Sequence, residues 1–412
     1  MDKIKILVVP SDTVGGVGFY RSFQPHIYLN EHKGEEYEIE FNTNPDWGDI
    51  KKLEEYNIIH VHKGLFGGMQ KFYEALVHLK SSNTITVLDI DDFWDLSPTH
   101  PQYAMQKQYQ LDQIIINNIK LFDYVTTTTC LFAKEIYKYN KHVFVFPNAI
   151  DPTDERFKIE KPKSDKIRVG MIMGSAHEHD VILMKDFIKQ LKPETIEKIE
   201  IVLCGFDLRG SVRTFNTKTG KVTERPLQPK ETVWYRYEQM LTNNYTIVSP
   251  EYKKFLNLFV SNLEYPNVEK EHYRRCWTKD INHYYSHYNN VDILLAPLEP
   301  KLFNHVKSEL KGIECCFSNT ALIASDYGPY KETLTNYLNK DGSVNHNGTA
   351  ILIPEEKNRT DWSKAIELLV NDPEKLKELQ DNLHNDFKDK YDLRNVCENR
   401  SNFYKEILKY SK

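Results

Sequence analysis

Residues 291–330 read VDILLAPLEPKLFNHVKSELKGIECCFSNTALIASDYGPY, and this stretch carries the strongest indication of the fold. Two apolar runs, Ile293–Ala296 and Ala321–Ala324, enclose a polar segment. This pattern predicts a strand, a loop, a helix and a second strand, joined as a right-handed crossover in a parallel sheet. The loop then lies at the carboxyl end of a parallel strand, which is the edge where open α/β sheets bind ligands.

Three charged residues of the polar segment have helical spacing. Lys307, Lys311 and Glu314 fall at i, i+4 and i+7, so on a helix they share one face. Two ammonium groups suit a diphosphate, and a carboxylate one turn further suits the paired hydroxyls of a ribose or a hexose. A nucleotide sugar carries both groups. The alternative is a solvated helix face without a ligand, and the spacing alone does not separate the two.

The composition is that of an ordinary globular protein with room for two domains. The chain has 412 residues, of which 27% are charged and 40% hydrophobic, and its formal net charge is −5. This charge gives no overall attraction to nucleic acid or anionic membranes. The six cysteines are scattered without a C-x-x-C motif, which argues against a zinc site or a disulfide framework and favours a reducing compartment. No apolar stretch has the length of a membrane span and none reads as a signal peptide, so we expect a cytoplasmic protein.

The order of the apolar runs predicts two α/β domains in tandem. Ile4–Val9 reads as a buried first strand, followed by a glycine-rich turn and a helix from about Tyr20. Further strand-like runs alternate with helical patterns, as in a doubly wound fold. A polar stretch with two prolines, 151–166, reads as a linker, and Ile167–Met173 reads as the first strand of a second domain. Further strands are expected at Tyr37–Phe41, Ile58–His62, Thr84–Ile90, Tyr124–Thr127, Val143–Phe146 and Ile199–Cys204.

The segment 206–290 is long for a connection and reads as an insertion in the second domain. It contains a predicted hairpin from Val212 to Glu224, with its turn at 218–220. It also contains an aromatic and basic cluster, which either forms a small core of its own or offers a stacking platform for a sugar or a nucleobase. The members of this cluster are Trp234, Tyr235, Arg236, Tyr237, Tyr273, Arg274, Arg275 and Trp277.

The segment from Asn304 to Glu314, with the pattern N-x-x-K-S-x-L-K-x-x-E, resembles the donor-binding region of retaining glycosyltransferases with the GT-B fold. The resemblance is to the large family 4, in a subgroup common among bacterial surface-polysaccharide and bacteriophage enzymes. That family usually has two glutamates separated by seven residues. Glu314 matches the second glutamate, and Val306 replaces the first.

The resemblance implies an α/β chain with two Rossmann-like domains that face a cleft. Residues 1–155 would form the acceptor-side domain, with a C-terminal helix at about 396–412 packing back onto it. Residues 156–395 would form the domain that binds the nucleotide sugar and would contain the insertion 206–290. The stretch Phe146–Asp151 resembles the turn that ends the first domain in many family members.

The donor-site residues that we expect are Gly174, Ser175, His177, Lys307, Ser308, Lys311 and Glu314. The glycine and serine after the second domain's first strand would hold phosphate through backbone N–H groups. The histidine lies where many relatives have basic residues. As the resemblance implies, the two lysines and the second serine would neutralise the leaving diphosphate, and the glutamate would bind the ribose.

On the acceptor side, a glycine-rich loop and a helix follow the first strand. Gly15 and Gly16 let backbone N–H groups approach a ligand closely, although a tight turn alone would explain them. In the family that the chain resembles, this loop lines the cleft beside the transferred sugar, and Arg21 would face the same cleft. His60 and His62 end another strand, and His62 is a further candidate contact, although polar residues at a sheet edge are common.

Three carboxylates lie at the end of the strand expected at Thr84–Ile90. Asp89, Asp91 and Asp92 cannot all ionise cheaply unless a cation or hydrogen-bond donors lie among them. One interpretation is the D-x-D metal site of GT-A glycosyltransferases, which would hold Mn²⁺ or Mg²⁺. The other, which the resemblance favours, places Asp91 or Asp92 against an acceptor hydroxyl in a GT-B enzyme. Asp89 would then cap the next turn.

The sequence therefore predicts a retaining hexosyltransferase that uses a nucleoside diphosphate sugar, such as UDP-glucose or a GDP-sugar. Because the lysines and helix termini can carry the diphosphate charge, we expect no metal or other cofactor. The acceptor would be a glycan hydroxyl, as in polysaccharide biosynthesis. Two alternatives stay open: a hydroxylated base in bacteriophage DNA, and an inactive relative that binds nucleotide sugars.

Overall fold

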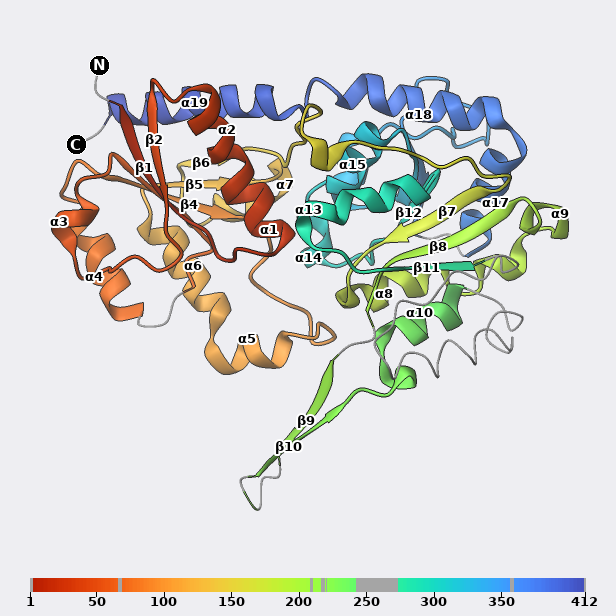
Figure 1. The fold of residues 1–412 in the computed structure, drawn as a ribbon, viewed down its shortest axis with the longest axis horizontal. Coiled ribbons are helices and arrows are strands. Elements are labelled where there is room, and N and C mark those ends of the chain that lie inside the picture. The colour runs from red at the N-terminus through yellow and green to blue at the C-terminus, as the bar shows by residue number, and fades with distance from the viewer. Residues whose placement is uncertain are drawn as a thin grey trace. The chain divides into compact units, whose positions relative to one another are not determined.

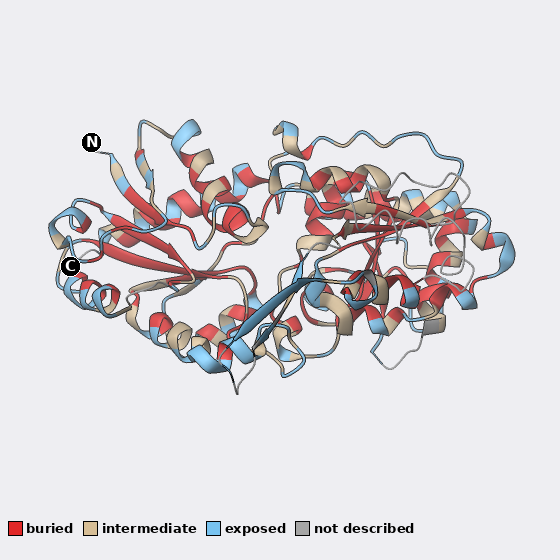
Figure 2. Ribbon diagram, turned by 60° about the horizontal axis from the view of Figure 1, so that its bottom comes forward, coloured by how far each residue is buried: buried red, intermediate tan, exposed pale blue. Residues whose placement is uncertain are grey.

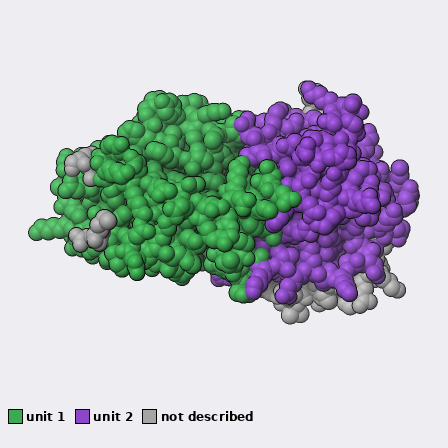
Figure 3. All heavy atoms as spheres, turned by 90° about the horizontal axis from the view of Figure 1, so that it is seen from above, with its two compact units in different colours: residues 1–157, 300–317, 385–412 green, residues 158–299, 318–384 purple. Residues whose placement is uncertain are grey.

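The computed structural model describes residues 3–65, 69–207, 210–215, 219, 221–241, 273–355 and 359–410 (Figure 1). The chain divides into two compact units, which Figure 3 colours separately. Unit 1 contains residues 1–157, 300–317 and 385–412, and unit 2 contains residues 158–299 and 318–384. Among the described residues, no helix is both long and apolar enough to cross a lipid bilayer.

Unit 1 is built on a six-stranded, fully parallel sheet with the strand order β2-β1-β3-β4-β5-β6. All the predicted strands of this half are confirmed, within one residue at their ends. The strands are β1 (Ile4–Val9), β2 (Tyr37–Phe41), β3 (Ile58–His62), β4 (Ile85–Ile90), β5 (Tyr124–Thr127) and β6 (Val143–Val145). The central strands β3 and β4 are buried along their whole length, which explains why most of their residues are apolar (Figure 2).

Two layers of helices cover the sheet of unit 1, because alternate residues of each strand face opposite sides. Ile6 and Val8 pack with helices α2 and α19, whereas Leu7 and Val9 pack with α4, α6 and α7. The helices of unit 1 are α1 (Gly16–Gly18), the π-helical turn η1 (Phe19–Phe23), α2 (Gln24–His32), α3 (Ile50–Leu53), α4 (Met69–Leu79), α5 (Tyr103–Tyr109), α6 (Leu111–Leu121), α7 (Cys130–Ile136), η2 (Glu155–Phe157), α14 (Leu302–His305), α15 (Leu310–Ser318, which ends in unit 2) and α19 (Leu393–Lys409).

Unit 2 has a second six-stranded parallel sheet, with the order β11-β8-β7-β12-β13-β14. The predicted pairing is confirmed: Ile293 lies beside Ala321 and Ala296 beside Ala324, in parallel register. The strands are β7 (Ile167–Ile172), β8 (Ile199–Phe206), β11 (Tyr273–Trp277), β12 (Ile293–Ala296), β13 (Ala321–Ser325) and β14 (Ile351–Ile353). The chain is therefore an α/β protein with two Rossmann-like sheets, as predicted.

Short helices and turns connect these strands. They are η3 (Ser175–His177), α8 (Glu178–Val181), η4 (Ile182–Met184), η5 (Phe187–Gln190), α9 (Pro193–Ile196), η6 (Pro229–Glu231), α10 (Val233–Leu241), α13 (Ile281–Tyr284), η8 (Tyr285–Asn290) and α16 (Gly328–Thr333). Two longer helices follow, α17 (Arg359–Asn371) and α18 (Pro373–Phe387).

The insertion contains the predicted hairpin. Strands β9 (Ser211–Phe215) and β10 (Val222–Pro226) pair in antiparallel register, and β10 is exposed along its length (Figure 2). Lys218 and Gly220 of the predicted turn lie outside the described residues.

The aromatic cluster of the insertion does not form a core of its own. Trp234, Tyr237 and Tyr273 are buried in the core of unit 2, and Tyr273 begins the edge strand β11. Two of its arginines pair with acidic residues on neighbouring elements: Arg275 contacts Glu238, and Arg274 contacts Glu200. The cluster therefore completes the main sheet, and its buried rings are not a stacking platform.

Candidate functional site

The carboxyl edge of the unit 1 sheet gathers charged residues at the ends of β3 and β4. These strands are neighbours in parallel register, with His62 beside Asp89. Lys63 directly follows β3 and Asp91 directly follows β4, so both emerge at the same edge of the sheet. Asp92 follows directly. We call Lys63, Asp91 and Asp92 the edge triad.

His62 holds Asp91 in place. Its Nε2 lies 3.1 Å from Asp91 Oδ1, and its Nδ1 lies 2.8 Å from the hydroxyl oxygen of Ser11. An ionised carboxylate can only accept, so Nε2 carries the proton and Nδ1 accepts from the serine hydroxyl. Both ring nitrogens are thus occupied, and the ring is buried. This arrangement makes His62 a positioning residue for Asp91.

The ammonium of Lys63 bridges the two aspartates, at 3.2 Å from Asp91 and 2.9 Å from Asp92. Burial alone would raise the pKa of Asp91, but the charge of Lys63 and the hydrogen bond from His62 hold this pKa well below its usual range. Lys63 has a left-handed backbone conformation, with φ of 61°. Such strain in a residue other than glycine often marks functional sites, and here it turns the chain at the end of β3.

Asp89 is not part of this group. It accepts two hydrogen bonds from the guanidinium of Arg21, at 2.9 and 2.8 Å, and a third from Thr126 at 2.6 Å. Burial would raise the pKa of Asp89, and Arg21 keeps it far below the usual value. The expected turn cap at Asp89 is therefore wrong. Arg21, which we expected to face a ligand, is buried inside unit 1, where it also donates to the carbonyl of Phe146.

The D-x-D interpretation as a metal site does not fit these contacts. Asp89 is paired with Arg21, whereas Asp91 is paired with His62 and Lys63, so the two carboxylates face different cations. In the part of the chain that the structure describes, no cluster of three or more histidine, cysteine, aspartate or glutamate side chains is arranged to hold a metal ion.

The glycine-rich loop after β1 binds a carboxylate of the protein itself. Asp12 accepts hydrogen bonds from the backbone N–H groups of Gly15, at 2.5 Å, and Gly18, at 3.2 Å. A Cβ atom on Gly15 would lie 2.7 Å from Asp12 Oδ1, and one on Gly18 would lie 2.4 Å from its carbonyl oxygen. The glycines allow this close approach, and the helix begins at Gly16, four residues before the predicted start.

The segment 300–317, which carries four of the expected donor-site residues, lies on the same edge of unit 1. Thr129 donates to the carbonyl of Val306 at 3.4 Å, and Asn148 donates to the hydroxyl of Ser308 at 3.1 Å. The side chain of Val306 is 1% exposed and belongs to the apolar core beneath. A glutamate at this position would bury an ionised group among apolar side chains, which explains the valine.

The prediction that Lys307, Lys311 and Glu314 share one helix face is wrong for Lys307. Helix α15 begins at Leu310, so Lys307 precedes it, and its ammonium lies 5.0 Å from the ring centre of Phe303. Lys311 and Glu314 are on the helix and form an ion pair of 2.8 Å. Glu314 is fully buried and also accepts from the hydroxyl of Tyr20 at 3.4 Å.

A cavity of about 160 Å³ opens at this edge within unit 1. Its polar lining includes Lys63, Asp92 and His100, and its walls are apolar, with Phe303 contributed by the segment 300–317. Burial lowers the pKa of His100, and so does the charge of Lys307, while Asp92 opposes them. The cavity therefore brings an acceptor-side candidate, Asp92, together with the segment that carries Lys307.

Lys63 and Ser11 were missed as site residues in the sequence. Lys63 follows β3 directly, and Asp91 directly follows the neighbouring strand β4. Opposite charges at the ends of adjacent parallel strands are a signal that could have identified this contact. Ser11 follows β1, on the other side of β3, and nothing in its surroundings in the sequence distinguishes it.

In unit 2, the three other expected donor-site residues follow β7. Gly174 precedes the short turn η3, and a Cβ atom there would meet nothing within 4 Å. The hydroxyl of Tyr237 accepts from the N–H of His177 and donates to the carbonyl of Gly174, both at 3.1 Å. The His177 ring pairs with Asp180 at 2.7 Å. The expected helix from about Asp180 is only a series of short turns, so a helix dipole contributes little here.

Comparisons with known proteins support the fold. No protein-family model and no curated protein sequence matches the chain. Sucrose-phosphate synthase from Thermosynechococcus elongatus has a similar structure, with a TM-score of 0.60 and 12% identity over 100% of both chains. HepE from Anabaena, solved with UDP-glucose, gives a TM-score of 0.57 and 12% identity over 98% of this chain and 99% of that one.

A third similar structure is an alpha-glucosyltransferase solved with UDP-glucose and with DNA that contains an abasic site. Its TM-score is 0.54, with 10% identity over 97% of this chain and 98% of the other. All three similarities cover nearly the whole chain at low identity, so they establish the fold and nothing finer. The fold is the GT-B fold of two Rossmann-like domains.

Proposed function

We propose that the chain is a retaining, family 4-like glycosyltransferase that moves a hexose from a nucleoside diphosphate sugar to a hydroxyl of a glycan. The observation that carries this proposal is the carboxyl edge of the unit 1 sheet. There the edge triad lies in the same unit as the segment that carries Lys307, Ser308, Lys311 and Glu314. Phe303 of that segment lines the same cavity as Lys63 and Asp92. The similar structures that hold UDP-glucose support a UDP-sugar donor, with a GDP-sugar as the other choice.

On the acceptor side, Asp91 and Asp92 would orient the attacking hydroxyl. Asp92 lines the cavity and its side chain is 44% exposed, so it can accept a hydrogen bond from that hydroxyl. Asp91 is held by His62 and Lys63, which keep it ionised. Gly15 would shape the neighbouring loop by donating to Asp12, and Gly16 would begin the helix that follows. Arg21 would support the end of β4 by pairing with Asp89.

On the donor side, Lys307, Ser308 and Lys311 would neutralise the leaving diphosphate. Glu314 would accept hydrogen bonds from the ribose, which requires the ribose hydroxyls to replace the Lys311 contact. In the second domain, proposed as residues 156–395, the backbone N–H groups at Gly174 and Ser175 would hold phosphate beside His177. These cations and backbone donors would carry the charge without a metal or another cofactor.

Retention would follow if the attack occurs on the face from which the diphosphate leaves. The bond between the anomeric carbon and the phosphate oxygen breaks, and the bond to the acceptor oxygen forms. The proton of the acceptor hydroxyl passes to the departing phosphate oxygen. The protein then needs no second carboxylate as a nucleophile, unlike the paired carboxylates of most retaining glycosidases.

Two other functions have an observation in their favour. A DNA-base acceptor, as in a bacteriophage, is supported by the similar structure that holds DNA, but three rings of the aromatic cluster that favoured it, Trp234, Tyr237 and Tyr273, are buried in the core of unit 2. An inactive cytoplasmic relative is supported by Val306, which removes one glutamate of the family pattern.

A donor and acceptor screen separates these functions. We expect transfer from a UDP- or GDP-hexose to a bacterial surface glycan, measured by release of the nucleotide and by mass of the product. Transfer to duplex DNA that contains hydroxymethylated bases would favour the DNA function instead. Donor binding without transfer or hydrolysis, for UDP-, GDP- and dTDP-sugars alike, would indicate the inactive relative.

The donor site is tested by two substitutions. Glu314→Ala and Lys307→Ala should each weaken donor binding about tenfold or more, because each removes a charge-assisted hydrogen bond worth roughly 1.5–3 kcal/mol. Isothermal titration calorimetry with the donor measures this. Lys301→Ala is the matched control, since Lys301 lies on the same segment and contacts Thr99. Unchanged affinity in both variants, with the fold intact, would remove the proposed donor site.

A further inference from the structure

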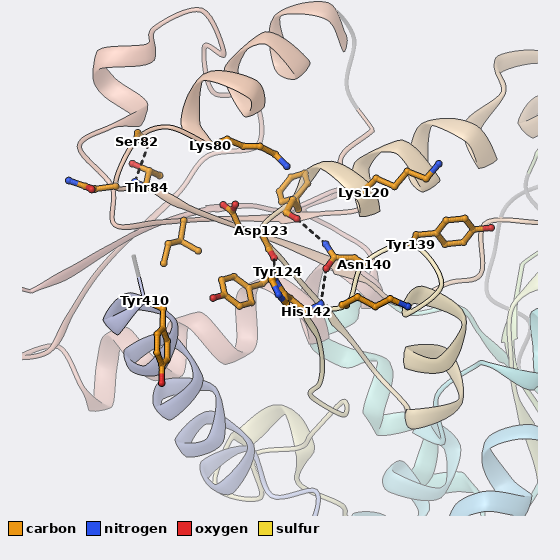
Figure 4. Close-up of a pocket in the computed structure, with 14 residues that line it drawn as sticks. Lys80, Ser82, Thr84, Lys120, Asp123, Tyr124, Tyr139, Asn140, His142 and Tyr410 are labelled. Atoms are coloured by element: carbon orange, nitrogen blue, oxygen red, sulfur yellow. Dashed lines mark hydrogen bonds between the residues drawn. The ribbon is translucent and has the colours of Figure 1, made fainter. Parts of the chain in front are cut away.

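A second groove lies at the opposite, amino-terminal edge of the unit 1 sheet. It has a volume of about 510 Å³, within the range of ligand pockets. Its walls come from the segment after α4, the end of α6, the start of β5, the turn before β6 and the residue after α19 (Figure 4). Nothing in the proposed transfer reaction uses this groove.

The groove is positively charged. Lys80, Lys120 and Lys141 line it, and all three are exposed. The acidic side chain in the lining, Asp123, accepts hydrogen bonds from the backbone N–H of Thr86 at 3.0 Å and from its hydroxyl at 2.8 Å. Lys80 and Lys120 form no ion pair with any other residue that the structure describes, whereas the Lys141 ammonium donates to the carbonyl of Tyr137 at 2.9 Å. The groove therefore presents ammonium groups that suit an anion.

Aromatic rings lie beside these cations. Tyr139 is 36% exposed, with the Lys120 ammonium 5.6 Å from its ring centre, and Tyr410 is 73% exposed. Tyr124 lies between them in Figure 4, and its ring packs beside His142, 5.4 Å between centres. Exposed aromatic rings can bury the C–H face of a pyranose, and the exposed side chain of Asn83 in the lining can bind hydroxyls. Rings and cations together suit a sugar that carries negative charge.

We propose that this groove binds an anionic glycan, a sugar polymer that bears carboxylate or phosphate groups, and holds it as the acceptor chain. This inference rests on the proposed function, in which the acceptor is a glycan. Strand β4 has six residues between the two edges, so the groove and the candidate site lie about 20 Å apart. A polymer held at one edge raises the effective concentration of its own end at the other.

A single-stranded nucleic acid shares the same chemistry of anions and rings, but the chain as a whole disfavours it. Its net charge is −5, and the lysines form one local group. Nucleic-acid binding without sequence preference uses a basic track along the backbone and several stacking rings in succession. The observations therefore favour the glycan.

The test measures binding of defined polymers without any donor, so that its outcome does not depend on transfer. The probes are oligogalacturonate, which carries carboxylates, and a phosphomannan fragment, which carries phosphates. Dextran of equal length is the neutral control. In affinity electrophoresis, we expect at least one anionic probe in the gel to retard the full chain, and we expect dextran not to retard it. The triple variant Lys80→Gln/Lys120→Gln/Lys141→Gln should bind that probe at least tenfold more weakly.

A second triple variant tests whether weaker binding depends on where the lysines lie and not only on the charge that is removed. Lys51→Gln/Lys71→Gln/Lys134→Gln removes the same charge from exposed positions of unit 1 outside the groove. It should bind the probe like the unaltered chain. Equal loss in both triple variants, no binding of either anionic probe, or equally tight lysine-dependent binding of a ten-nucleotide thymidine strand would overturn the proposal.

Kinetics separate this inference from the proposed function. If the groove holds the acceptor polymer, the groove variant should raise KM for a long anionic acceptor about tenfold. It should leave kcat, and KM for a monosaccharide acceptor, unchanged. If transfer fails in every variant while the polymer still binds in a lysine-dependent manner, the proposed function is wrong and the binding site stands. If KM for the long acceptor does not change, the acceptor role is wrong.

Discussion

Arg21 and Asp89 form an ion pair that is buried at the centre of unit 1. Their side chains are 1% and 0% exposed, and the guanidinium also contacts Asn148 at 3.2 Å. The pair therefore ties the first helix to β4 and to the loop after β6. Ion pairs of this kind add little net stability compared with apolar side chains, but removing one partner leaves an uncompensated buried charge.

We predict that Arg21→Met lowers the free energy of unfolding by about 3–5 kcal/mol, because Asp89 is then buried without its cation. Urea unfolding followed by circular dichroism measures this. Arg156→Met is the control, since the Arg156–Asp154 pair is partly exposed and should cost about 1 kcal/mol or less. Equal losses in the free energy of unfolding would show that the buried pair contributes no more to stability than the partly exposed pair.

Among the residues proposed for the acceptor side, Asp91 has the best-defined contacts, with His62 and Lys63. We predict that Asp91→Asn lowers kcat by about 10- to 10²-fold, because it removes a charge-assisted hydrogen bond, worth roughly 1.5–3 kcal/mol, that would orient the attacking hydroxyl, and that it changes the dissociation constant of the donor little. Asp95→Asn, on the same loop and exposed, should leave both values unchanged. A variant Asp91→Asn with full transfer activity would place the acceptor elsewhere.

Single residues show where reading the sequence succeeded and where it failed. The acidic run at the end of β4 predicts cations or hydrogen-bond donors among its three carboxylates, and the ion pairs with Arg21 and Lys63 confirm this. The partners were not predictable, because Arg21 and Lys63 are brought to these carboxylates by strand order and not by sequence distance. Val306 was recognised as a departure, but only its burial explains why the position is apolar.

At the level of elements, three parts of unit 1 meet in one buried polar group. His26 of α2 bonds to the hydroxyl of Tyr404 of α19 at 2.8 Å, and its ring centre lies 4.6 Å from that of His60 of β3. The buried guanidinium of Arg400 of α19 lies 3.5 Å from His60 Nε2 and 3.5 Å from the hydroxyl of Tyr404. The two histidines thus share a site with a permanent positive charge.

This group predicts a dependence of stability on pH. Burial and then the charge of Arg400 lower the pKa of His26 to about 3, and burial lowers that of His60 well below its usual value. In the unfolded chain both rings take up protons near pH 6.5. The unfolded state therefore binds more protons below pH 6.5, and the free energy of unfolding should fall as the pH drops, by up to about 1.4 kcal/mol per pH unit and histidine.

Urea unfolding at pH 7, 6 and 5 measures this slope. The variant His26→Gln keeps polar atoms at the site but cannot titrate, so its stability should fall less steeply between pH 6 and pH 5. A slope that is the same in both proteins would assign the effect to other groups. Asp89 does not contribute in this range, because its depressed pKa affects stability only below about pH 4.

The elements themselves were predictable wherever burial made the sequence apolar. Apolar or alternating runs predicted the strands of both sheets except β14, which has only three residues, and β11. The sequence of β11, YRRCW, carries two arginines, and it forms a strand because Glu238 and Glu200 neutralise them from neighbouring elements. The early start of α1 was missed for a similar reason, since Asp12 supplies the cap from outside the helix.

At the scale of the whole chain, unit 1 is completed by residues far from it in sequence. Helix α19 packs its apolar face on the sheet and on α2, and Val396, Phe403 and Ile407 belong to that core. The hydroxyl of Tyr37 in β2 also bonds to Ser401 at 2.7 Å. The first 157 residues therefore lack part of the helical layer on one face of their sheet, where α2 remains.

We predict that a chain ending at Asp392 does not fold unit 1. Losing α19 exposes several apolar side chains, each worth about 1.5–3 kcal/mol, and the sum is comparable with the whole stability of a typical domain. Limited proteolysis with mass spectrometry should then show cleavage throughout residues 1–157, while unit 2 stays resistant. A chain ending at Lys409 is the control, because it removes only the exposed Tyr410 and the residues after it. Protection of 1–157 in the shorter chain would mean that the amino-terminal sheet carries its stability without the returning helix.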